Sequence, residues 1–427
     1  MNRTIQPEIK KLKDFSVPKP ERVILPNGVP LTIINAGEQE VVRMDIIFAG
    51  GRWQQSQKLQ ALFTNRMLRE GTQKYSASTI AERLDYYGSW LELSSSSEHA
   101  YITIYSLNKY LKETLEVIES MIKEPLFPQK ELSTILEANI QQYLVNSSKV
   151  DFLAHRCLLE HLYGEKHPCG QLIVENDYRA ITPELLNDFY KKHYHSGNCS
   201  IFLSGKVTEE TIQHVTTILG TSFGEYDLKS PKNTFPFLAA NEKRFFVERS
   251  EALQSAVKMG STTITRNHPD YHKLRVLLTL FGGYFGSRLM TNIREDKGYT
   301  YSISAGIMFY PDSGLIGIST ETDNQYVEPL IHEVYNEIDR LHQEPVFIEE
   351  LEMVRNYMLG EMCRSYESPF SLSDAWIFIA TSELDDSYFY RSFQAVNEIT
   401  PLEIQDLAQR YLCKETLKEV IAGKKLS

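Results

Sequence analysis

The sequence predicts an α+β protein built from two homologous domains, each a mainly antiparallel sheet with helices packed on one face. The chain has 427 residues, whereas a single hydrophobic core stops growing at roughly 250–300 residues. Its two halves share sequence at a nearly constant offset. In each half, strand-like segments alternate with runs of helical periodicity, which is typical of helices layered on an antiparallel sheet.

The internal repeat is carried by two separate matches. Residues 119–132 resemble residues 337–351, with Glu-Pro pairs 220 positions apart. Residues 189–207 resemble residues 407–424, with tyrosines 217 positions apart. Because both matches have nearly the same offset, they indicate two copies of one supersecondary unit rather than two coincidences.

The first unit shows strand and helix signals in alternation. Ser76 or Ser78 is a suitable cap for the helix that follows it, and residues 99–106 alternate in the manner of a half-buried strand. We therefore expect strands at 41–49, 99–106 and 199–205, and helices at 53–70, 78–87, 110–123, 129–146 and 183–193.

The second unit repeats that order. Residues 226–242 contain prolines and little periodicity, so they are expected to link the two units. The predicted domains are residues 1–225 and 243–427. In the second domain we expect strands near 256–260, 299–309 and 314–320, and helices at 270–280, 286–295, 325–342 and 348–364.

Composition excludes several functional classes. Lys and Arg number 45 against 56 Asp and Glu, a net charge of −11 that disfavours binding to a nucleic-acid backbone. No apolar run approaches the ~18–20 residues needed to span a bilayer. The five cysteines form no C-x-x-C pair, which argues against a disulfide framework or a cysteine zinc site. The first 28 residues lack the apolar stretch of a secretory signal, so a cytoplasmic location is expected.

The most informative segment is residues 50–72, GGRWQQSQKLQALFTNRMLREGT. Together with the repeat, it resembles the pitrilysin/insulinase (inverzincin) family of zinc peptidases, whose smaller members include the mitochondrial processing peptidase subunits. The resemblance continues through residues 163–170, 189–198 and 281–316, and thus spans nearly the whole chain. It implies two similar α+β domains that face each other as a clamshell. The family positions kept in the first segment are Gly51, Arg52, Trp53, Ala61, Phe63, Met67, Leu68, Gly71 and Thr72.

The zinc motif itself is lost. In H-x-x-E-H, two histidines on one helical face bind zinc and the glutamate acts as base toward the zinc-bound water. The resemblance places Leu62 and Arg66 at the histidine positions and Asn65 at the glutamate position. The third ligand falls at Ala138, or at Glu137 if the match slips by one residue. Leucine offers no electron pair and a guanidinium repels a cation, so no catalytic zinc is expected in this chain.

Two histidine groups are alternative metal sites. His155 and His161 are six residues apart and therefore lie on different faces of a helix, so a helix-packing face is the simpler interpretation. His193 and His195 flank a helix end, where a cationic residue suits the helix dipole. No nucleophile motif surrounds the cysteines.

Residues 281–301, FGGYFGSRLMTNIREDKGYTY, leave three interpretations open. Gly282, Gly283 and Gly286 resemble the glycines of a phosphate-binding loop, but no Gly-Lys-Ser/Thr follows them. They are also compatible with a plain turn into a helix capped near Ser287. The segment also resembles the family's second domain, which implies a functional loop, with Gly282 and Gly283 as substrate-binding residues.

In that second domain an arginine and a tyrosine seven residues apart face the zinc site, and here they are Arg294 and Tyr301. Arginine offers a planar fork of donors to peptide carbonyls, and a tyrosine hydroxyl can stabilise an oxyanion. The alternative is that Arg294 pairs with Glu295 or another surface acid and that Tyr301 is half-buried core.

The family's substrate-pairing edge strand corresponds to residues 88–97, GSWLELSSSS. The family's asparagine-alanine pair is replaced here near Leu91 and Glu92. Strand addition uses backbone groups and tolerates such changes, so peptide binding at this edge stays open.

These observations lead to one hypothesis. The chain resembles the non-catalytic subunit of a bacterial two-subunit zinc peptidase related to mitochondrial processing peptidase. A homologous catalytic partner would carry H-x-x-E-H and its zinc, and this chain would contribute Arg294 and Tyr301 to a shared site for peptide substrates. The chain itself needs no cofactor and is not expected to cleave peptides alone. The alternative is a proteolytically inactive scaffold or peptide-binding protein of the same fold.

Overall fold

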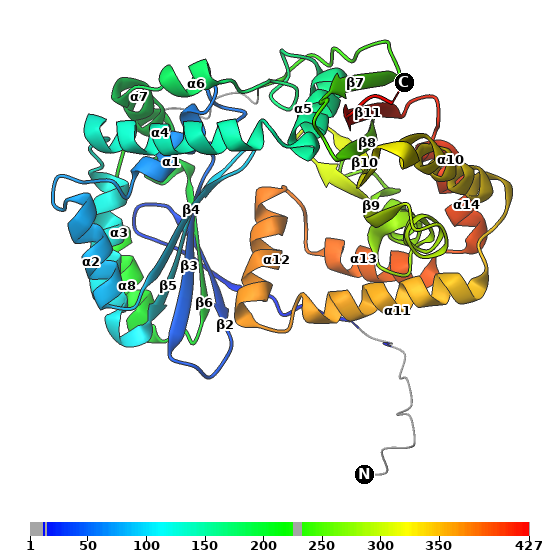
Figure 1. Ribbon diagram of the computed structural model, residues 1–427. Helices are drawn as coiled ribbons and strands as arrows, with labels where there is room; N and C mark the ends of the chain where they lie inside the picture. The colour runs from blue at the N-terminus through cyan, green and yellow to red at the C-terminus, as the bar shows by residue number, and fades with distance from the viewer. Residues whose placement is uncertain (1–11, 13–14, 225–232, 427) are drawn as a thin grey trace.

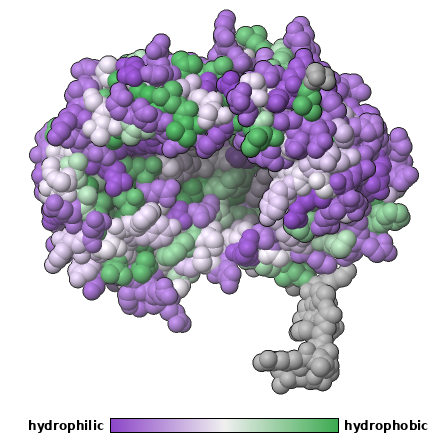
Figure 2. All heavy atoms as spheres, viewed as in Figure 1, coloured by the Kyte–Doolittle hydropathy of each residue, from purple (hydrophilic) through white to green (hydrophobic). Residues whose placement is uncertain are grey.

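The computed structural model describes residues 12, 15–224 and 233–426, and it contains two sheets with helices around them (Figure 1). Residues 225–232, which form part of the expected linker, lie outside the described residues. The same holds for residues 1–11, 13, 14 and 427. The strands of one sheet all come from residues 21–205 and those of the other from residues 244–423. Figure 2 shows that the surface is hollowed between the two halves.

The first sheet has six strands in the order β1-β2-β6-β3-β5-β4. β2 and β6 are parallel, and the other neighbours are antiparallel. The centre of the sheet is β3, whose apolar run is buried along almost its whole length. The strands are β1 (Glu21–Ile24), β2 (Pro30–Asn35), β3 (Val41–Phe48), β4 (Trp90–Ser95), β5 (Ala100–Leu107) and β6 (Cys199–Gly205).

The second sheet has the order β7-β11-β8-β10-β9. β7 and β11 are parallel and the other pairs are antiparallel, so the order and directions match β2-β6-β3-β5-β4 strand for strand. This agreement confirms the two homologous units inferred from the repeat. The strands are β7 (Arg244–Glu248), β8 (Gln254–Thr263), β9 (Thr300–Phe309), β10 (Gly314–Asp323) and β11 (Lys418–Gly423).

The helices of the first unit largely follow the sequence prediction. Ser76 caps its helix by accepting a hydrogen bond from the backbone N–H of Thr79, as expected. The helix expected at 53–70 is wrong in extent, because the residues before Gln60 form turns that carry Trp53 into a buried cluster. The helices are α1 (Gln60–Met67), α2 (Ala77–Tyr86), α3 (Leu111–Lys123), α4 (Gln129–Asn146), α5 (Val150–Tyr163), α6 (Glu175–Arg179), α7 (Pro183–His193) and α8 (Glu209–Leu219).

The second unit departs from prediction at one place that matters for the site. The segment expected as an α-helix at 286–295 is π-helical over Met290–Asp296, and a second π-helical segment covers Thr279–Gly283. The backbone N–H of Lys297 donates to the carbonyl of Asn292, five residues back, at 3.1 Å. The α-helices are α9 (Tyr271–Leu278), α10 (Val327–Gln343), α11 (Ile348–Arg364), α12 (Pro369–Thr381), α13 (Ser387–Glu398) and α14 (Pro401–Tyr411).

One helix of each unit packs against the sheet of the other unit. α5, from the first half, packs against β8 and β11 of the second sheet, and α12, from the second half, packs against β6 and β2 of the first sheet (Figure 1). Trp376 and Ile377 on α12 share a buried cluster with Ile47 of β3 and Phe202 of β6. Leu158 on α5 shares another with Val420 of β11. The two halves therefore have common hydrophobic cores.

An ion pair accompanies each exchanged helix. Arg43 on β3 contacts Asp374 of α12 at 2.7 Å, and Lys258 on β8 contacts Asp151 at the start of α5. Both cations are on the central strand of a sheet and are 9% exposed. Burying such a charge is unfavourable unless it is paired, so each pair fixes the register of the helix that crosses it.

Within the described part of the chain, none of the helices combines the length and the apolar character that crossing a membrane requires.

The packing of α12 predicts that substitutions at two tryptophans lower the free energy of unfolding by very different amounts. Trp376 is 4% exposed, packs against Phe389 with ring centroids 5.3 Å apart, and donates from Nε1 to the carbonyl of Pro18 at 3.0 Å. Trp376→Ala should lower the free energy of unfolding by about 3–5 kcal/mol. Urea titration followed by circular dichroism measures this. Trp90→Ala removes a side chain that is 65% exposed and should cost less than about 1 kcal/mol. Equal losses would contradict the packing of α12 on the first sheet.

Candidate functional site

The helix that would carry the zinc motif is α1, which follows β3. Leu62 is half-buried and lies at the wall of a cavity of about 410 Å³ that Arg52, Lys58 and Ser95–Ser97 also line. None of the described residues that line this cavity is acidic. Its positive and apolar lining is unsuited to a divalent cation.

Asn65, at the position of the catalytic glutamate, is a structural crosslink. Its side chain is fully buried, and Nδ2 donates to the carbonyls of Ser94 at 2.7 Å and Tyr101 at 3.1 Å. Oδ1 accepts from the hydroxyl of Tyr194 at 3.3 Å. These bonds join α1 to β4, β5 and the end of α7. An amide that is committed to three partners cannot act as a general base.

Arg66, at the second histidine position, turns toward α4. Its Nη1 donates to Oδ1 of Asn139 at 2.7 Å. Ala138, the residue matched to the third ligand, is exposed, and Glu137 is also exposed and pairs with Arg179 at 3.1 Å. The residue of α4 that faces α1 is therefore Asn139, one position beyond the predicted one.

These residues do not fit a zinc ion. An alkyl group, a hydrogen-bonded amide and a guanidinium offer no free electron pair. Across residues 15–224 and 233–426, no group of three or more His, Cys, Asp or Glu side chains is arranged to hold a metal.

The other histidines have packing contacts. His161 stacks on Phe245 with ring centroids 3.6 Å apart. His193 is 4% exposed, and burial lowers its pKa to about 4. The expectation that His193 is a cation at the end of α7 is wrong, because burial keeps it neutral at pH 7.

In the second half, Arg294 and Tyr301 are in direct contact. The Arg294 guanidinium lies 5.4 Å from the centroid of the Tyr301 ring and 4.6 Å from that of the Phe285 ring. Tyr301 is 87% exposed and Phe285 is 61% exposed. Among the described residues, Arg294 has no acidic partner, so the alternative of a surface ion pair with Tyr301 in the core is not what the structure shows.

Two aromatic faces therefore hold the Arg294 side chain, and its N–H groups are uncommitted. A cation between aromatic faces gains roughly 0.5–2 kcal/mol. Sequence reasoning missed Phe285. A signal for it exists, because Phe285 precedes the segment of Arg294 by a few residues in a loop where glycines otherwise dominate.

The glycines of this loop serve close packing. A Cβ on Gly282 would lie 2.6 Å from the Cβ of Ala305 on β9, so only glycine allows the π-helical segment to approach the strand. Gly283 is less restricted, with its closest contact at 3.2 Å. No described contact assigns a substrate-binding role to Gly282 or Gly283, and that role stays a prediction.

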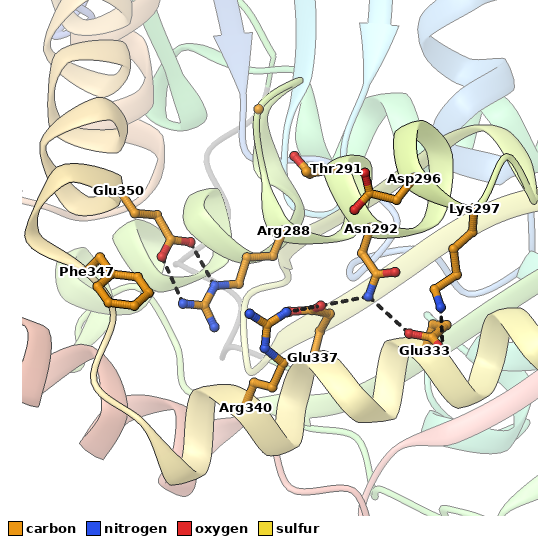
Figure 3. Close-up of a pocket in the computed structure, with 11 residues that line it drawn as sticks. Arg288, Thr291, Asn292, Asp296, Lys297, Glu333, Glu337, Arg340, Phe347 and Glu350 are labelled. Carbon is orange, nitrogen blue, oxygen red and sulfur yellow. Dashed lines mark hydrogen bonds and ion pairs between the residues drawn. The ribbon is translucent and has the colours of Figure 1, made fainter.

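A groove of about 680 Å³ lies along the opposite side of the Met290–Asp296 segment, and oppositely charged side chains form pairs in it (Figure 3). Arg288 donates to both oxygens of Glu350, at 2.7 and 2.8 Å. Asn292 donates to Oε1 of Glu337, which is 1% exposed, at 2.7 Å. Lys297 contacts Glu333 at 3.1 Å. These contacts attach the segment to α10 and α11, which positions Arg294 on the other side.

The edge strand expected at 88–97 is β4, Trp90–Ser95. It pairs with β5 on one side and is the last strand of its sheet. Its outer backbone groups are thus available for strand addition, and peptide binding there stays a prediction.

Among the described residues, no hydrogen bond or ring contact joins the α1 positions to Arg294 or Tyr301. The α1 positions contact β4, β5, α4 and α7, whereas Arg294 contacts Phe285 and Tyr301. The α1 positions of the first half thus offer no zinc ligands, and the second half has a half-buried cation between aromatic rings.

Comparison with known proteins identifies the class of this two-unit fold. Residues 34–172 match the model of the insulinase family, peptidase family M16, and residues 180–358 match that of the peptidase M16 inactive domain. The chain belongs to the insulinase (M16) family of peptidases and is of its inactive type.

Among its relatives is an uncharacterized zinc protease, YmxG, of Bacillus subtilis, 23% identical over 82% of this chain and 85% of that protein. A non-peptidase homolog YmxG of Helicobacter pylori is 24% identical over 56% of this chain and 55% of that protein.

Two solved structures have the same fold. A peptidase M16 inactive domain from Pseudomonas fluorescens superimposes with a TM-score of 0.82 at 22% identity, covering 96% of this chain and 99% of that one. A protease from Helicobacter pylori gives a TM-score of 0.86 at 14% identity, covering 96% and 100%.

The crosslinking role of Asn65 predicts a stability effect. Asn65→Ala leaves two backbone carbonyls and the Tyr194 hydroxyl without their partner in a buried place, and should lower the free energy of unfolding by about 2–4 kcal/mol. Chemical denaturation measures this. Asn139→Ala, which removes the half-exposed amide that binds Arg66, is the matched control and should cost about 1 kcal/mol or less. An Asn65→Ala variant as stable as the control would rule out the crosslink.

Buried histidines predict a stability loss at acidic pH. Burial lowers the pKa of His193 and of His272 to about 4, whereas an unfolded histidine has a pKa near 6.5. Each histidine therefore favours the folded state above pH 6.5, and its contribution is lost as pH falls toward 4. The loss is roughly 3 kcal/mol per histidine at pH 4. Urea unfolding of His193→Gln between pH 7 and 4 should show a shallower decline than the native chain.

The control for this experiment is His332→Gln, which changes an exposed side chain on α10 and should leave the decline unchanged. A His193→Gln variant with the native pH dependence would show that His193 is protonated in the folded state.

Proposed function

We propose that this chain is the non-catalytic subunit of a two-chain zinc peptidase and that it contributes Arg294 and Tyr301 to the active site of a zinc-bearing partner. The observation that supports the proposal most is the half-buried Arg294 guanidinium between Phe285 and Tyr301, which has no acidic partner among the described residues. A scaffold gains little from a cation that has no acidic partner and lies between two exposed rings. A subunit that binds the backbone of a substrate needs such a group.

The partner would supply zinc and the activated water through H-x-x-E-H. The residues of this chain would bind and orient the substrate. The Arg294 fork would donate to carbonyl oxygens of an extended peptide, and the Tyr301 hydroxyl would donate to the oxygen that becomes negative when water attacks the scissile carbonyl. The rings of Phe285 and Tyr301 would hold the planar guanidinium in one orientation, so that its N–H edge faces the substrate.

The proposal includes further points. The partner is expected to be a homologous chain of the same fold, the substrates to be peptides, and the compartment to be the cytoplasm. The net charge of −11 favours basic peptides by electrostatic attraction.

The test is hydrolysis of a quenched fluorescent peptide library by this chain alone, by a homologous zinc-bearing chain of the same organism alone, and by the mixture. Activity should need both chains. In the mixture, Arg294→Ala and Tyr301→Phe should each reduce kcat/KM by about 10²–10³-fold, the usual effect of losing one oxyanion donor.

The matched controls are Arg364→Ala and Tyr390→Phe, which change an exposed arginine and an exposed tyrosine elsewhere on the second half. Both controls should retain full activity. A partner that is fully active alone, or a mixture that is indifferent to Arg294→Ala and Tyr301→Phe, would refute the shared site and leave a scaffold or peptide-binding role.

A further inference from the structure

A second cavity, of about 730 Å³, lies between α9, the end of β9 and the helices α11, α12 and α13. Its volume is in the range of small-molecule sites, roughly 300–1,000 Å³. Figure 1 shows α11 along the lower edge of the second half, α13 above it, and α12 upright between α13 and the first sheet. Aromatic side chains form much of the lining: Tyr271, Phe309, Tyr366, Phe378, Tyr388 and Phe389.

Arg275 of α9 lines this cavity, and its neighbours are tyrosines rather than acids. Its guanidinium lies 5.9 Å from the ring centroid of Tyr271, and Tyr388 and Tyr366 are its other close titratable neighbours. Within the part of the chain that the structure describes, no carboxylate forms an ion pair with Arg275. A guanidinium withdrawn from water without an anion is energetically unfavourable.

The remaining charges at the cavity are already engaged. Glu361 pairs with Arg364 at 2.7 Å, and Asp374 pairs with Arg43 at 2.7 Å. Arg266 donates to Oγ of Ser382 at 3.0 Å and lies over the rings of Phe309 and Phe378. Among the described residues neither Arg266 nor Arg275 has a carboxylate partner, but Arg266 is held by Ser382 and two rings, so Arg275 is the cation that is free to bind an anion.

This cavity shares no lining residue with the contacts of Arg294, although Gly283, two residues before Phe285, is part of its wall. Both contact β9, but Tyr301 is at the start of the strand and Phe309 at its end. Eight residues of extended strand span about 26 Å. The cavity also borders α9. This helix follows β8 as α1 follows β3, so α9 has the position in the second unit that the zinc-motif helix has in the first.

We propose that this cavity binds the C-terminal residue of a peptide, with its free carboxylate on Arg275 and an apolar side chain against the aromatic lining. A guanidinium binds a carboxylate through two parallel hydrogen bonds, and the Tyr388 hydroxyl is placed to support it. The nearby carboxylates of Glu361 and Asp374 disfavour ligands of higher negative charge, such as phosphates. A single carboxylate on an apolar residue matches one free cation in an aromatic cavity.

The proposal does not depend on the shared active site, because it would hold equally for a scaffold that captures peptides. Its test is the fluorescence anisotropy of an N-terminally labelled hexapeptide, GSGALF, titrated with the intact chain. The peptide with a free C-terminus should bind, and its C-terminal amide should bind at least about tenfold more weakly. Arg275→Gln should weaken binding of the free-acid peptide by about the same factor.

Two further variants separate binding from folding. Arg275→Gln breaks no ion pair, so its thermal unfolding midpoint should equal or exceed that of the native chain. Arg275→Lys keeps the charge but loses the planar fork, so it should bind more weakly than the native chain while still preferring the free acid. Arg249→Gln, which changes an exposed arginine that is not part of the cavity lining, should bind like the native chain.

Several outcomes would overturn the proposal: no binding of the free-acid peptide at millimolar chain concentration, equal binding of acid and amide, or unchanged binding by Arg275→Gln. Displacement of the peptide by inorganic phosphate as effectively as by unlabelled peptide would also overturn it, since that result indicates a general anion site.

Discussion

The structure depends on the exchange of one helix between its two halves. α5 covers part of the second sheet and α12 covers part of the first, and each helix meets a cation on the central strand beneath it, Lys258 or Arg43. Because the two helices bury apolar residues of the opposite sheet, neither half has a complete core without the other. The exchange is found in both units, whose sheets have the same strand order.

On this common scaffold, the two units have diverged in chemistry. In the first unit, the positions of a zinc peptidase have become packing groups: Asn65 is bonded on every side, and Arg66 is held by Asn139. In the second unit, Arg294 lies between exposed rings and Arg275 lines an aromatic cavity, and neither has an acidic partner among the described residues. The first unit has thus lost the residues that would bind a metal, and the second has kept two cations to which our proposals assign peptide binding.

Much of this fold was predictable from the sequence, because the repeat, the capping residues and the alternating strands are local signals. The exchange of α5 and α12 was not, since it depends on contacts between residues far apart in the sequence that leave no periodic pattern. Register caused the error at α4: a slip of one residue rotates a side chain by about 100°, which turns Ala138 outward and Asn139 toward Arg66. The partner of Arg294 was likewise hidden, because Phe285 reaches it only through the irregular turn between the two π-helical segments.

The common cores have a mechanical consequence. A hinge motion that separates the two halves would remove Trp376 and Leu158 from the clusters they share with the opposite sheet. Exposing each large apolar side chain would cost several kcal/mol, on the order of the loss caused by a large-to-small core substitution. The two halves of the chain therefore resist moving apart. If two such chains enclose a substrate, the seam through which it enters and leaves lies between the chains, and traffic is governed by how tightly they associate.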